Sequence, residues 1–143
     1  MKKPVASYDR IDDLKRLMVN ARRLGDEAIY NAAFKRRCQL EGINQDDPLH
    51  RDFFEVLAAY EELLEEKHGR KQRASYTRRK VKETGVEQCL IDWALDPKET
   101  DGFQTLRDRG MLDLTGEHVV TKYPDRFDDH VVAAAKARLE RYR

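Results

Sequence analysis

The chain has 143 residues, of which 40% are hydrophobic and 38% are charged, and its formal net charge is +1. This length suits one domain with a buried core, and this hydrophobic content excludes a largely disordered chain. The net charge near zero argues against a generic nucleic-acid-binding domain, because such domains usually carry a large basic excess.

The sequence carries no signal for a membrane or an oxidising compartment. No apolar run reaches the ~20 residues that a membrane-spanning helix needs, and the first residues do not resemble a signal peptide. Cys38 and Cys89 are too far apart in the sequence to form a close pair of metal ligands. We therefore expect a soluble, cytoplasmic protein with reduced cysteines and no membrane partner.

The first 42 residues predict a pair of helices. Apolar residues recur every three or four positions over 11–21, with Asp9 as the candidate N-cap and Gly25 as a left-handed stop. A second helix is expected from Asp26 to Gly42, where small alanines allow close approach to a neighbour. The two helices are expected to form a hairpin.

The strongest helical pattern follows, with Asp47 as N-cap, Pro48 at the first helical position and an end near His68. Its polar side carries the acidic residues of 52–66. Its apolar stripe, expected at the centre of the core, consists of Leu49, Phe53, Val56, Leu57, Tyr60, Leu63 and Leu64.

Two short helices are expected after the long one. Ser75 can cap a helix over 76–84, which Gly85 interrupts. The second, over 86–94, has an apolar face on which Trp93 is expected to be a core anchor.

The last third of the chain continues the helical pattern. Thr100 or Asp101 can begin a helix that Gly110 ends, and Asp128 can cap a final helix. Between them, residues 112–123 fit either a helix capped by Thr115 or a small β-hairpin, and we favour the helix.

The predicted fold is therefore all-α, a compact single-domain bundle of about six to eight helices, with a small hairpin near 112–123 as the alternative. The domain covers 1–143. Within it, residues 1–69 would form a helical core, and 70–143 would hold a basic segment and the C-terminal helices.

No catalytic site, metal site or cofactor is predicted. Glu65-x-x-His68 places a carboxylate and an imidazole on one helix face, but a di-metal bundle site needs a second copy and further inward glutamates. The glycines match no phosphate-binding loop. We do not predict an enzyme, and a metal-dependent nuclease built from dispersed acidic residues is the lesser alternative.

The most informative feature is the basic segment, residues 70–82, which holds seven of the cations and no carboxylate. The other 130 residues sum to −6, with 21 Lys or Arg against 27 Asp or Glu. The seven cations are Arg70, Lys71, Arg73, Arg78, Arg79, Lys80 and Lys82.

A helix start at Ser75 would place Arg78 and Arg79 in the first turn, where the helix dipole disfavours cations. A bound phosphate would reverse that cost by accepting the backbone N–H groups, the Ser75 hydroxyl and the arginines. We therefore predict that Ser75 and the seven cations contact the phosphate backbone of a nucleic acid, DNA in the first instance and RNA otherwise.

Two other uses of the basic segment stay open. It can pair with the acidic face at 52–66, within one chain or in a second copy. It can also make the chain a protein-interaction module or homodimeric adaptor, in which the cations dock on an acidic protein surface.

Overall fold

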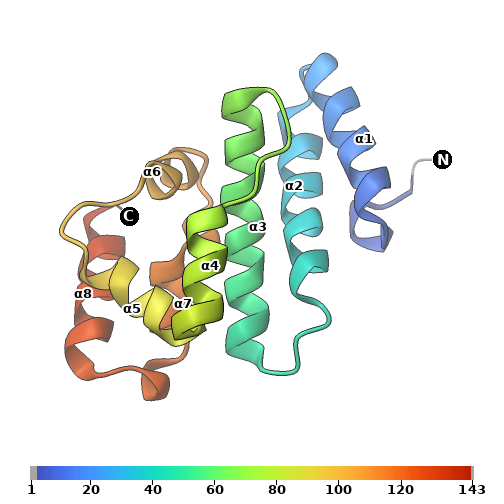
Figure 1. Cartoon of the computed structure of the whole chain (residues 1–143). Coiled ribbons are helices and arrows are strands. Elements are labelled where there is room, and N and C mark those ends of the chain that lie inside the picture. Colours follow the sequence, from blue (N-terminus) through green and yellow to red (C-terminus); the bar gives the residue numbers. More distant parts are fainter. Residues whose placement is uncertain (1–2, 143) are drawn as a thin grey trace. The chain divides into compact units, whose positions relative to one another are not determined.

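The computed structural model describes residues 3–142, and within that range the regular structure consists of eight α-helices and three short 3-10 helices (Figure 1). The range contains no strand, so the all-α class and the predicted number of helices are confirmed. None of the helices in this range is both long and apolar enough to cross a membrane. The contacts divide the chain into two units, and the boundary along the sequence lies between Glu62 and Leu63. The single domain stays a prediction.

The first unit is a helical hairpin followed by most of the longest helix. It holds η1 (Val5–Ser7), α1 (Ile11–Arg23), α2 (Glu27–Gly42) and the larger part of α3 (Pro48–His68). Figure 1 shows α1 and α2 lying side by side, as the sequence predicts. Gly25 has a φ of 71°, which allows the tight turn between them.

An aspartate caps α2, whereas the cap predicted for α1 is wrong. The Asp26 side chain accepts a hydrogen bond of 3.1 Å from the Ile29 amide and so caps α2. Helical bonding in α1 begins with Leu14, whose amide donates to the Arg10 carbonyl at 3.2 Å. Arg10 is therefore the N-cap, and Asp9 lies one residue too early to cap the helix.

The start of α3 fits closely against the end of α2. The Asp47 side chain accepts a hydrogen bond of 2.9 Å from the Leu49 amide, which confirms it as the cap. A Cβ atom at Gly42 would clash with the Arg51 carbonyl, so only glycine allows this approach. The buried side chains of this unit include Leu14, Met18, Phe34, Cys38, Leu49, Phe53, Val56 and Leu57.

The second unit packs short helices around α7. Besides the end of α3, it consists of α4 (Ser75–Thr84), α5 (Val86–Leu95), α6 (Asp101–Asp108), η2 (Leu112–Leu114), α7 (Gly116–Lys122), η3 (Pro124–Arg126) and α8 (Asp129–Arg141). Contacts join α7 to both α5 and α8, and α4 to α5.

Caps set two helix starts in this unit. Thr100 accepts a bond of 3.0 Å from the Phe103 amide, and Thr115 accepts one of 3.3 Å from the His118 amide. The second bond caps α7, so the favoured helix, and not the alternative hairpin, follows Thr115. Asp128 occupies the N-cap position of α8 as predicted, although within the described chain its side chain makes no capping hydrogen bond.

Candidate nucleic-acid interface

The basic segment begins where α3 ends and continues into α4. Gly69 has a φ of 72°, a left-handed conformation that ends α3 without strain. Residues 70–74 are not helical, and residues 75–82 are the first eight positions of α4. The cations are thus divided between a non-helical link and a helix.

The predicted role of Ser75 as N-cap is wrong by one residue. The Arg78 amide donates to the Ala74 carbonyl at 2.9 Å, so Ala74 is the N-cap and Ser75 is the first helical residue. The first turn therefore ends at Arg78, and Arg79 opens the second turn. The helix dipole disfavours these two cations less than the sequence predicts, since its effect is confined to the first turn.

All seven cations lie in the described part of the chain, and most of them face solvent. Ser75, which was predicted with them, is exposed as well. The exposed cations are Arg70, Lys71, Arg73, Arg79 and Lys82.

The two remaining cations are committed elsewhere in the chain. Lys80 is half-buried and forms an ion pair with Asp92 of α5, which also accepts a hydrogen bond of 2.9 Å from Gln88. The hydrogen bond to Asp92 raises the pKa of Lys80, and the same bond holds the pKa of Asp92 below its usual value. Arg78 is half-buried too and has a partner within the chain.

The start of α4 offers backbone donors to an anion. Its first turn contains no acidic residue, and among residues 3–142 no side chain caps it. The amide groups at a helix start carry partial positive charge and lack partners within the helix. Arg73 is exposed just before this turn, and Arg79 just after it. Donors and cations therefore occupy the same stretch of chain.

Two carboxylates of the acidic face of α3 bind cations outside the basic segment. In the first unit, the Glu62 carboxylate forms ion pairs with Lys15, at an N–O distance of 2.8 Å, and with Arg37, at 2.6 Å. In the second unit, Glu66 accepts two hydrogen bonds from the Arg109 guanidinium, at 2.9 and 3.0 Å. Glu62 and Glu66 are therefore engaged by Lys15, Arg37 and Arg109.

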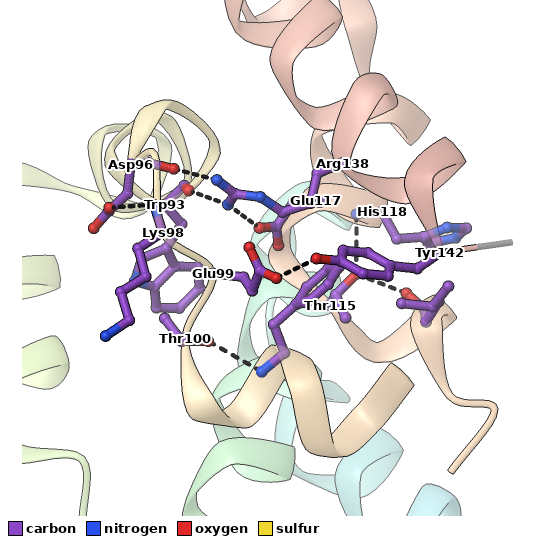
Figure 2. Close-up of polar contacts among 12 residues, drawn as sticks. Trp93, Asp96, Lys98, Glu99, Thr100, Thr115, Glu117, His118, Arg138 and Tyr142 are labelled. Carbon is purple, nitrogen blue, oxygen red and sulfur yellow. Dashed lines mark hydrogen bonds and ion pairs between the residues drawn. The ribbon is translucent and has the colours of Figure 1, made fainter. Parts of the chain in front are cut away.

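A second polar cluster, centred on Arg138, lies inside the second unit, and the sequence reasoning missed it. Figure 2 shows the Arg138 guanidinium between Glu117 and the end of α5. One nitrogen donates to Glu117 at 2.7 Å and to the Trp93 carbonyl at 2.9 Å, and the other donates to the Asp96 carbonyl. Arg138 shares its helix face with Val131, and a charge on an apolar face is the signal that could have identified it.

Glu117, the partner of Arg138, is 3% exposed. Burial raises the pKa of this carboxyl group, although the hydrogen bond from Arg138 opposes the rise. Its Oε1 atom has no hydrogen-bond partner within residues 3–142. The pair links α7 and α8 to the backbone that follows α5. We assign this cluster to the stability of the fold.

Neither metal geometry nor known proteins assign a function to the chain. Within residues 3–142, no group of three or more His, Cys, Asp and Glu side chains could hold a metal ion. Comparisons with protein-family models, with curated proteins and with solved structures found no match. The basic segment is therefore the candidate site, because its cations are concentrated and mostly exposed.

Proposed function

We propose that the chain binds nucleic acid by contacting backbone phosphates with the exposed cations of the basic segment. The observation that carries this proposal is the exposure of five cations within a stretch of 13 residues that has no carboxylate. Phosphate contacts of this kind are independent of base sequence and supply most of non-specific affinity.

The charge distribution supports a polyanionic partner. Lys15, Arg37, Arg109 and Arg138 each form an ion pair with a carboxylate, whereas the exposed cations of the basic segment lie in a run that contains no carboxylate. The exposed cations of the basic segment lie close together in the sequence, and charges within about 8 Å repel one another at physiological salt. A row of phosphates would remove that repulsion and release condensed counterions.

The start of α4 supports a phosphate position in particular. A phosphate placed there would accept backbone N–H groups of the first turn together with charged hydrogen bonds from Arg73 or Arg79. The Ser75 hydroxyl lies in the same turn and can donate to the same group. Lys80 is not needed for this contact, because Asp92 already neutralises it.

The test is a binding titration with a labelled DNA oligonucleotide, as duplex and as single strand, followed by fluorescence anisotropy. The key variant is Arg79→Ala/Lys82→Ala, because both side chains are exposed on α4 and neither lies in the core. We expect weaker binding and a slope of log affinity against log salt that is shallower by about 1.8 for duplex, or two phosphate contacts.

The matched control is Arg23→Ala/Lys136→Ala, which removes two exposed positive charges outside the basic segment. It should leave the slope unchanged. Equal weakening by both double variants would show a diffuse charge effect and refute a local site. If the chain binds no DNA, but self-associates and loses that association in Arg79→Ala/Lys82→Ala, the basic segment docks on protein instead.

A further inference from the structure

Tyr76 is the only aromatic residue among the exposed large hydrophobic side chains of residues 3–142. Its exposed fraction is 76%, and it lies inside the basic segment, at the second position of α4. An exposed aromatic ring in a run of cations is a combination that the folding of the chain does not require.

Other tyrosines of the chain have their rings in contact with neighbouring groups. The Tyr30 ring is buried and lies 4.0 Å from the Arg22 guanidinium. The Tyr142 ring packs near Phe103 and lies 4.6 Å from the Arg107 guanidinium. Within the described residues, no comparable ring contact involves Tyr76. With 76% of its surface exposed, the side chain is accessible to a ligand.

The position of Tyr76 on α4 places it beside phosphate-binding groups. Residues three and four positions apart are neighbours on a helix surface, so Arg79 and Lys80 lie next to Tyr76 one turn further on. Of these two, Arg79 is the exposed cation, whereas Lys80 is paired with Asp92. Glu83 is exposed two turns away and limits the basic part of this face to the N-terminal end of α4. The ring and the exposed cations can therefore engage one strand together.

We propose that Tyr76 stacks on a base of single-stranded nucleic acid while the cations around it contact the phosphates. This inference rests on the proposed function and adds a preference for single strands. In a duplex, each base already stacks on its neighbours, whereas a single strand offers free base faces to an aromatic side chain. Stacking is tolerant of sequence, because every base has such a face.

The test compares a labelled oligothymidylate of about 16 nucleotides, within the usual site size, with a duplex of equal length at the same salt. An oligouridylate serves as the RNA arm. We expect Tyr76→Ala to weaken single-strand binding roughly tenfold and to leave duplex binding unchanged. Tyr76→Phe keeps the ring and should retain the affinity of the wild type.

A direct readout comes from Tyr76→Trp, whose added indole should lose fluorescence when oligothymidylate binds, beyond any change of Trp93 in the wild type. Equal effects of Tyr76→Ala on single strand and duplex, or no effect on either, would overturn the stacking role while phosphate binding stands. If the wild type binds neither the oligothymidylate nor the duplex, the proposed function itself is refuted.

Discussion

At the scale of one residue, Lys80 shows why a count of cations overstates the number that are free to contact phosphate. The side chain was predicted to contact phosphate, yet it forms an ion pair with Asp92, twelve positions along the chain. A lysine that keeps this partner adds little to phosphate binding, because its charge is already neutralised. Removing the carboxylate should therefore free a sixth cation.

We expect Asp92→Asn to strengthen duplex binding and to steepen the slope of log affinity against log salt by about 0.9, equal to one phosphate contact. The asparagine oxygen can still accept the hydrogen bond from Gln88, so α5 should be preserved. The measurement is the same anisotropy titration at several salt concentrations. In contrast, Lys80→Ala should change the slope by much less than Lys82→Ala. An unchanged slope in Asp92→Asn would contradict the pairing.

Glu117 and Arg138 make a residue-scale prediction about stability. Glu117→Leu would leave the Arg138 charge buried with backbone carbonyls as its remaining partners. Breaking a buried pair on one side usually lowers the free energy of unfolding by about 3–5 kcal/mol. Urea unfolding followed by Trp93 fluorescence measures this loss.

The control is Lys136→Ala, an exposed change on the same helix, α8, that should alter the free energy of unfolding by less than about 0.5 kcal/mol. If Glu117→Leu and Lys136→Ala have similar free energies of unfolding, the buried pair does not contribute to the stability of the fold.

At the scale of elements, the close contact between α7 and α5 depends on Gly116. A Cβ atom at this position would lie 2.6 Å from Cε3 of the Trp93 ring, too close for any side chain to tolerate without movement. Gly116→Ala should therefore lower the free energy of unfolding by about 1–3 kcal/mol, as overpacking usually does. Trp93 is the single tryptophan, so its emission should shift as well. An unshifted spectrum and unchanged stability would show that α5 and α7 are not held this closely.

Helix caps provide a second test at this scale, because the structure distinguishes two aspartates that lie near predicted helix starts. Asp26 caps α2 through the Ile29 amide, whereas Asp9 lies outside the cap position of α1. Asp26→Ala should therefore cost about 0.5–2 kcal/mol of stability. Asp9→Ala should stay within about 0.5 kcal/mol, as is usual for surface changes. Thermal unfolding compares the two variants. A larger loss for Asp9→Ala would reverse the assignment.

The accuracy of the sequence predictions follows from the range of the interactions involved. Caps such as Asp47 and Thr115 act over two or three residues, so the local pattern identified them correctly. Asp9 and Ser75 were one residue out, because the cap depends on backbone angles that a sequence does not specify. These errors moved helix starts without changing which elements form.

At the scale of the whole molecule, the net charge of +1 conceals two kinds of cation. Some cations form ion pairs with carboxylates that are distant in the sequence, as Arg109 does with Glu66 and Arg138 with Glu117. Such pairs depend on the fold and could not be predicted from spacing. The density of cations in the basic segment could be predicted, but their division into exposed and committed side chains required the structure. The exposure of Tyr76 required it too.

The salt dependence of duplex binding tests the central claim most directly. Each phosphate contact contributes about 0.9 to the slope of log affinity against log salt, so five exposed cations predict a slope of roughly −4 to −5. The Arg79→Ala/Lys82→Ala variant should have a shallower slope of roughly −3. No binding at low salt, or a slope near zero in the wild type, would contradict a phosphate-binding role for residues 70–82.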